Sequence, residues 1–165
     1  MLISVFAWGV VRSAGDRRAL RVVGGLLIAY GVICVVWPFA PMHLRGQGFT
    51  LTDTMHIAFA MLTVVLMLLA IGFGSAAFGK HFRVYSIATM VLLLGFGVMT
   101  TLDAPRVAAD LPTPWVGLWE RINIAVFLLW VVVLAVVLLR AQRVSVAVLA
   151  FSARPPSRPR APVTS

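Results

Sequence analysis

The chain has 165 residues, of which 61% are hydrophobic and 12% charged, and its formal net charge is +9. Soluble domains carry roughly 45–50% apolar and about 25% charged residues, and a compact soluble fold of this length cannot bury so large an apolar share. The composition therefore excludes an ordinary water-soluble enzyme, a nucleic-acid-binding domain and a disordered regulator. It predicts a protein that lies mostly in lipid.

The N-terminal segment 1–11 is apolar but too short to cross a bilayer, which takes roughly 20 apolar residues. No basic residue precedes it, so it does not resemble a signal peptide. Basic residues follow it instead, as they do at the inner end of a membrane helix. We expect either a partial, tilted helix packed against the others, or the last half of a span whose start is missing or misassigned.

Four later stretches are long and apolar enough to span a membrane. They predict transmembrane helices at about 22–39, 55–78, 84–102 and 119–140. Together with the partial helix they predict an all-α, polytopic transmembrane helix bundle within residues 1–143. Small residues four positions apart suit close helix packing, and they occur at Gly25/Ala29, Ala70/Gly74 and Gly72/Ala76.

The segment 144–165 is predicted to be a basic, proline-rich tail. Its part Ser152–Ser165 holds four prolines and three arginines, and it cannot bury a core, so we expect it to be disordered. Its arginines either remain solvated and set the topology or contact anionic lipid, at roughly 1 kcal/mol each. We favour the solvated role.

The basic residues alternate between the two sides of the predicted membrane. Eleven lie on one side: Arg12, Arg17, Arg18, Arg21, Lys80, Arg83, Arg140, Arg143, Arg154, Arg158 and Arg160. Three lie on the other: Arg45, Arg106 and Arg121. Because loops rich in Arg and Lys stay in the cytoplasm, this bias predicts a cytoplasmic C-terminus.

The polar residues that could carry chemistry gather on the predicted external side. They form a candidate polar cluster of His43, Arg45, Asp53, His56, Asp103, Glu120 and Arg121. Carboxylates at helix N-termini are favoured by the helix dipole, so Asp53 is expected to cap a helix. Asp103 and Arg121 have the wrong sign for their predicted helix ends, and we expect them to pair with each other.

His56 follows Asp53 by three residues, so the two share a helix face, about one turn or 5 Å inside the interface. One interpretation makes His56 a proton acceptor or metal ligand beside Asp53, Asp103 and Glu120. The other makes it a hydrogen-bonded structural histidine beneath a loop. We favour the structural interpretation.

Several weak motifs occur in a characteristic order. PMHLRG (41–46) is followed by a polar Thr/Asp stretch, by His56, by an acid at a helix end, and by Gly-Leu-x-Glu-Arg-Ile (117–122) before a helix rich in Leu, Trp and Val. This order, over about Arg18 to Arg143, resembles the bacterial membrane proteins of domain of unknown function 998. The resemblance implies about six spans, so that the first span and most of the second would be missing here. It implies fold and location and no activity.

We favour a non-catalytic integral protein of the bacterial cytoplasmic (inner) membrane, whose polar cluster is structural or binds a lipid headgroup or a partner. The alternatives are an intramembrane lipid hydrolase that uses His56 with Asp53 or Asp103, and a small transporter. No nucleotide, haem, metalloprotease or serine-nucleophile motif is present, so no cofactor or metal is expected. Nucleic acid is excluded as a partner, the bilayer is expected as one, and the oligomeric state stays open.

Overall fold

The computed structural model describes residues 2–43, 46 and 48–152, the last eight of them by their backbone alone. The chain divides into two units, Met1–Val132 and Val133–Ser165, and a helix runs through the boundary. In order, the elements are α1 Leu2–Ser13, α2 Arg18–Val36, η1 Trp37–Phe39, α3 Leu51–Ser75, α4 Lys80–Leu102, α5 Ala104–Ala108 and α6 Val116–Ser152.

Four of these helices are long and apolar enough to cross a membrane, and α1 is a shorter apolar helix. The prediction of an all-α bundle with four spans and a partial helix is therefore confirmed. Each long helix begins three or four residues before its predicted span, because hydropathy detects the apolar centre of a helix and misses its polar first turn. In α2 and α4, for example, that first turn carries Arg18 and Lys80.

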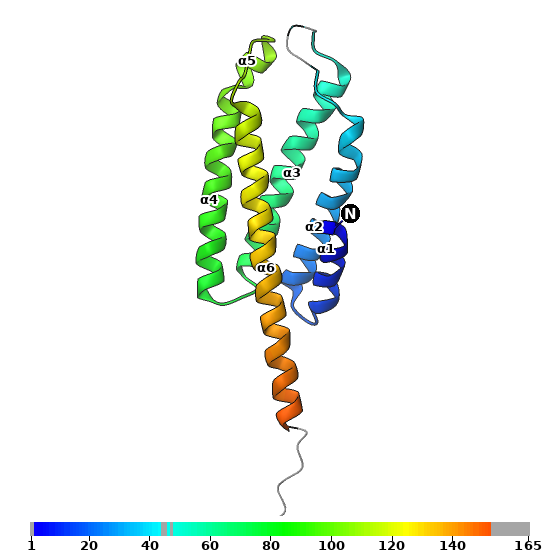
Figure 1. Cartoon of the computed structure of the whole chain (residues 1–165), viewed down its shortest axis with the longest axis vertical. Helices are drawn as coiled ribbons and strands as arrows, with labels where there is room; N and C mark the ends of the chain where they lie inside the picture. The colour runs from blue at the N-terminus through cyan, green and yellow to red at the C-terminus, as the bar shows by residue number, and fades with distance from the viewer. Residues whose placement is uncertain (1, 44–45, 47, 153–165) are drawn as a thin grey trace, which may run out of the picture. The chain divides into compact units, whose positions relative to one another are not determined.

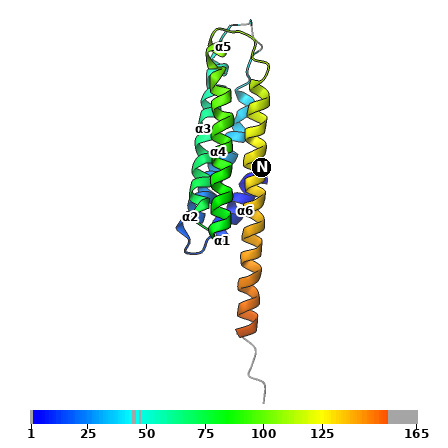
Figure 2. The same ribbon diagram turned by 90° about the vertical axis from the view of Figure 1, so that its left-hand side faces the viewer.

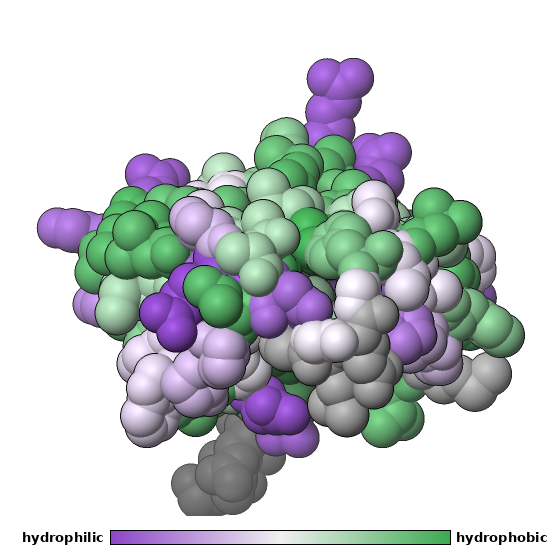
Figure 3. All heavy atoms as spheres, turned by 90° about the horizontal axis from the view of Figure 1, so that it is seen from above, coloured by the Kyte–Doolittle hydropathy of each residue, from purple (hydrophilic) through white to green (hydrophobic). Residues whose placement is uncertain are grey.

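Within the first unit, α2, α3 and α4 stand side by side with alternating directions, and α1 lies against part of α2 (Figures 1 and 2). The connections 40–50 and 103–115 consequently meet at one end of the helices, which is at the top of Figure 1. We call these two connections, together with the first two turns of α3 and α6, the cap. Seen from above, the cap end shows hydrophilic residues beside exposed hydrophobic ones (Figure 3).

Glycines let α1 approach α2 closely. A Cβ on Gly24 would meet the side chain of Val11 and lie 3.1 Å from the carbonyl oxygen of Ala7, and a Cβ on Gly31 would meet Ser4 Oγ. The predicted packing pair Gly25/Ala29 is wrong for this contact, since a Cβ on Gly25 meets nothing within 4 Å. One position along a helix is a rotation of about 100°, which is enough to exchange the packed face for the exposed one.

Trp130 on α6 fills the interior of the first unit. A Cβ on Gly74 would lie 2.6 Å from its ring, so the predicted pair Ala70/Gly74 does face the core, whereas Gly72 meets nothing within 4 Å. The ring packs on Phe127 and Phe82, and its indole nitrogen donates a hydrogen bond to Ser86 Oγ at 3.0 Å.

Large apolar side chains cover the outside of the helices. Val91 on α4 is 64% exposed, and Met61 and Leu129 are exposed on α3 and α6. Water would oppose such a surface, but lipid tails accept it. Cys34, on α2, is also exposed.

Helix α6 continues to Ser152. The predicted tail boundary at residue 144 therefore falls inside a helix, because the sequence 144–151 is itself apolar and holds no proline. The predicted disorder of the arginine- and proline-rich part, beyond Ser152, lies outside the described residues.

Candidate functional site

Thr50 and Asp53 build the start of α3. Thr50 Oγ1 accepts a hydrogen bond from the Asp53 amide at 3.4 Å, and Asp53 Oδ2 accepts one from the Thr50 amide at 2.8 Å. This reciprocal pair is a capping box, which satisfies backbone donors that a helix start leaves free. Asp53 therefore caps a helix, as predicted.

Asp53 also holds the loop before α3. Its Oδ1 accepts a hydrogen bond from the backbone amide of His43 at 2.7 Å, and the His43 Nδ1 atom lies 3.3 Å from Oδ2. The hydroxyl of Thr50 donates to Oδ2 at 2.6 Å. The carboxylate is 2% exposed, yet both of its oxygens have donors from the chain. A buried charge needs such donors, because burial removes the water that would otherwise solvate it.

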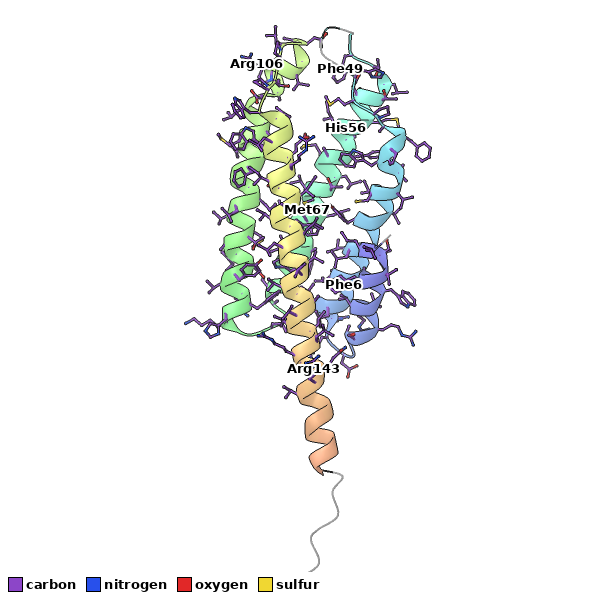
Figure 4. All side chains as sticks on the ribbon, viewed as in Figure 1. Phe6, Phe49, His56, Met67, Arg106 and Arg143 are labelled. Carbon is purple, nitrogen blue, oxygen red and sulfur yellow. The ribbon has the colours of Figure 1, made fainter. Side chains whose placement is uncertain are left out.

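His56 lies one turn further along α3, on the side of the loop (Figure 4). Its Nδ1 atom is 2.8 Å from the carbonyl oxygen of Ala40. A carbonyl oxygen can only accept, so Nδ1 carries the proton. The ring meets Trp37 edge to face, with ring centroids 4.9 Å apart. The hydrogen bond to Ala40 and the ring contact with Trp37 thus fix the two ends of the η1 turn against His56. Both contacts agree with a structural role for His56.

A second carboxylate joins the two cap connections. Asp110 lies between α5 and α6, and its Oδ2 accepts hydrogen bonds from the amides of Gly46 at 2.7 Å and Gly48 at 3.5 Å. Both glycines and Asp110 have positive φ angles, of 88°, 82° and 54°. Glycine adopts this backbone region without strain and Asp tolerates it better than most residues.

The predicted pair of Asp103 and Arg121 is wrong: among the described residues no ion pair joins the two side chains. Arg121 Nη1 donates instead to the carbonyl oxygen of Gly117 at 2.7 Å, one turn back on its own helix. Asp103 ends α4 but also precedes α5, so it lies at a helix start as well as a helix end. A negative charge is unfavourable at a helix C-terminus but favourable at a helix N-terminus, so Asp103 does not require a basic partner.

The remaining members of the predicted cluster are spread over the cap. Glu120 lies half-buried in the second turn of α6. Arg45 falls outside the described residues. Arg106, which was not predicted to be a site residue, donates from Nε to the carbonyl oxygen of Pro112 at 3.1 Å and thereby closes the turn after α5 (Figure 4). Within the described ranges, no group of three or more His, Cys, Asp or Glu side chains could hold a metal ion.

Polar groups inside the helices are few. Besides Asp53 and Ser86, the buried polar residues in the described part of the chain are Thr63, Thr89 and Asn123. Both threonine hydroxyls donate to backbone carbonyls of their own helices, at 2.8 and 2.9 Å. Asn123 Oδ1 is the one buried side-chain oxygen or nitrogen of the described residues without a hydrogen-bond partner. Such contacts match helices that cross lipid, where free polar groups are costly.

The family described as "Protein of unknown function (DUF998)" matches residues 1–137, which cover all of the first unit. The chain belongs to the DUF998 family. No curated protein and no solved structure matches it. Family membership leaves the function to be inferred from the contacts.

Sequence reasoning missed Thr50, Asp110 and the two glycines that Asp110 holds. Thr50 had a usable signal, because a threonine three residues before an acid and ahead of an apolar run is typical of a capping box. Gly46 and Gly48 flank one residue in a loop and signal a turn. Nothing in the sequence indicates that their partner is 64 positions away.

Proposed function

We propose that this DUF998 protein is a non-catalytic integral protein of a bacterial cytoplasmic membrane, and that its cap is a structural closure of the outer end of the helices. One observation carries the proposal: both oxygens of the Asp53 carboxylate accept hydrogen bonds from Thr50 and His43 of the same chain. The Nδ1–H of His56 goes to the Ala40 carbonyl and not to a carboxylate, so the imidazole is held by backbone. A catalytic histidine is instead usually oriented by an acid.

The hydrolase alternative requires His56 to act with Asp53 or Asp103. Among the described contacts, no hydrogen bond links His56 to either carboxylate, and Asp103 lies at the α4–α5 junction. A catalytic dyad needs the base and its orienting acid within hydrogen-bond reach. The contacts therefore favour the structural role.

The proposed topology places the cap outside and the C-terminus in the cytoplasm. Its support is the distribution of basic residues, eleven against three, between the two ends of the helices. A reporter enzyme that is active only in the cytoplasm, fused after Ser165, should be active. Activity only of a reporter that works outside the membrane would reverse this topology.

The test of the structural role separates stability from chemistry. His56→Asn keeps a donor near the Nδ1 position and removes the imidazole, whereas His56→Ala removes both. Each variant is expressed in a deletion strain of the host at a matched protein level, and the lipid composition of the cells is measured beside thermal unfolding of the purified protein. We expect the Asn variant to give the wild-type lipid composition. A variant that unfolds like wild type but leaves cells with the lipid composition of the deletion strain would overturn the proposal.

A further inference from the structure

Helix α6 is much longer than a membrane requires. It comprises 37 residues, which extend about 55 Å at 1.5 Å per residue. The hydrocarbon core of a bilayer is about 30 Å thick. The charge-free stretch 122–139, bounded by Arg121 and Arg140, covers about 27 Å and matches that core by itself. The helix then continues for twelve residues, 141–152, past Arg140.

This continuation is unusual in composition. Its sequence is AQRVSVAVLAFS, in which eight of twelve residues are apolar and Arg143 is the one charge. A helix that is apolar on most sides is not stable in water and needs a cover. Either lipid or another protein surface could cover the helix. The charges near residues 141–152 distinguish these two partners.

The charges around the continuation all have one sign. Arg140, Arg143, Arg154, Arg158 and Arg160 lie in or beside it, and no Asp or Glu occurs after Glu120. A second copy of the same segment would bring like charges together. An anionic membrane surface attracts them, and each arginine near such a surface strengthens binding about fivefold.

The length of α6 permits this placement without a break in the helix. Spanning helices tilt by up to about 40° from the membrane normal. At that tilt, with the charge-free stretch 122–139 centred in the bilayer, the helix axis lies about 14 Å from the bilayer centre at Arg143, which is the edge of the core, and about 25 Å from it at Ser152. The long side chain of Arg143 (labelled in Figure 4) can extend from the edge of the core to the lipid phosphates.

We propose that the last three turns of α6, residues 141–152, form an interfacial segment that binds the headgroup layer of anionic phospholipids. The apolar composition of the segment suits the boundary with the acyl chains, and the arginines of this region of the sequence carry the charge that attracts lipid phosphates. The proposal does not depend on which side of the membrane carries the C-terminus. It assigns the continuation a partner of defined chemistry, which is the phosphate of an anionic phospholipid.

The test uses the full chain in vesicles. Cys34, the one cysteine, is changed to Ser, and Ser152→Cys carries a spin label whose access to water-soluble and lipid-soluble relaxing agents is measured. Vesicles contain phosphatidylcholine with or without phosphatidylglycerol. We expect the label to be shielded from the water-soluble agent with phosphatidylglycerol, and less so without it or at high salt.

Matched variants test the charge. The double variant Arg143→Gln, Arg154→Gln removes the charges on the two sides of residues 144–152. The double variant Arg143→Lys, Arg154→Lys keeps both charges and is the control. The Gln pair should lower the ratio of shielded to exposed label about fivefold for each arginine, and the Lys pair should preserve it. Equal exposure of the label in both kinds of vesicle would overturn the proposal. So would spin–spin broadening that disappears on dilution with unlabelled protein, because it would show that a second copy covers the segment.

Discussion

The carboxylate of Asp110 accepts a hydrogen bond from the amide of Gly46 at 2.7 Å, across 64 positions of the sequence. Gly48 donates to the same oxygen. One side chain thus fixes the loop before α3 to the connection before α6. Asp53 accepts hydrogen bonds from the backbone amides of His43 and Thr50 in the same loop. The conformation of the cap therefore depends on two carboxylates that accept hydrogen bonds from backbone amides.

Removal of the Asp110 carboxylate should loosen the loop before α3. Asp110→Gly deletes the acceptor while it still permits the positive φ angle of 54°. We expect amide exchange in the peptide around Gly46 to rise about fivefold to tenfold, since a lost hydrogen bond is worth about 1 kcal/mol. Hydrogen–deuterium exchange of the protein in detergent measures this. Asp16→Gly, at the opposite end of the helices, is the control, and the same exchange in both variants would contradict the role of Asp110.

The capping box gives a second prediction. Thr50→Ala removes the acceptor for the Asp53 amide and one donor to the carboxylate, so unfolding should become easier by about 1 kcal/mol. Thr50→Ser keeps the hydroxyl and should retain most of the stability. Thermal unfolding in detergent compares the two. Thr54→Ala, one turn later and exposed, provides the matched control, and a loss as large as that of Thr50→Ala would refute the capping role.

Local patterns in the sequence predicted much of this fold, because lipid leaves the backbone little choice besides the helix. The helix-capping role of Asp53 follows from a dipole argument that needs only its neighbours. The wrong pairing of Asp103 with Arg121 came from the same argument, applied without knowledge of α5 and of the Gly117 carbonyl.

Contacts between distant segments were beyond such reasoning. The turn residues of the 41–50 loop are visible in the sequence, but Asp110 as their partner is not. The packing face of α2 illustrates the same limit at shorter range, because a choice between neighbouring glycines requires the direction of α1.

The buried pair of Trp130 and Ser86 gives a third prediction. Ser86→Ala leaves the indole N–H without an acceptor in the core and should cost about 1 kcal/mol. Trp130→Phe removes the donor, so adding Ser86→Ala to it should cost much less than in the wild type. A double-mutant cycle of unfolding free energies measures the coupling. Additive losses would mean that the hydrogen bond contributes nothing.

His56 provides a fourth prediction. The Ala40 residue is 1% exposed, so its carbonyl has little access to water if the imidazole is removed. We expect His56→Ala to destabilise the protein by about 1–3 kcal/mol. Asn places its amide nitrogen close to the Nδ1 position and should restore part of the loss, whereas Gln places it near Nε2 and should not. Equal unfolding temperatures for the Asn and Gln variants would argue against the bond to Ala40.

Two adjacent glycines on α2 provide the last prediction. A Cβ on Gly24 would lie 3.1 Å from the Ala7 carbonyl oxygen and the Val11 amide nitrogen, both of them backbone atoms, so α1 as a whole must move. On Gly25 a Cβ meets nothing within 4 Å. Both substitutions to Ala gain helix propensity, about 1 kcal/mol, but only Gly24→Ala overpacks the contact, at about 1–3 kcal/mol.

Gly25→Ala should therefore unfold at the wild-type temperature or slightly above it, and Gly24→Ala below it. Gly24→Val, with two further methyl groups, should lower the temperature further. Exchange of the α1 amides in detergent locates the effect, because a displaced α1 exchanges faster while α3 and α4 do not. If both alanine variants behave alike in the two measurements, α1 does not pack on the Gly24 face of α2.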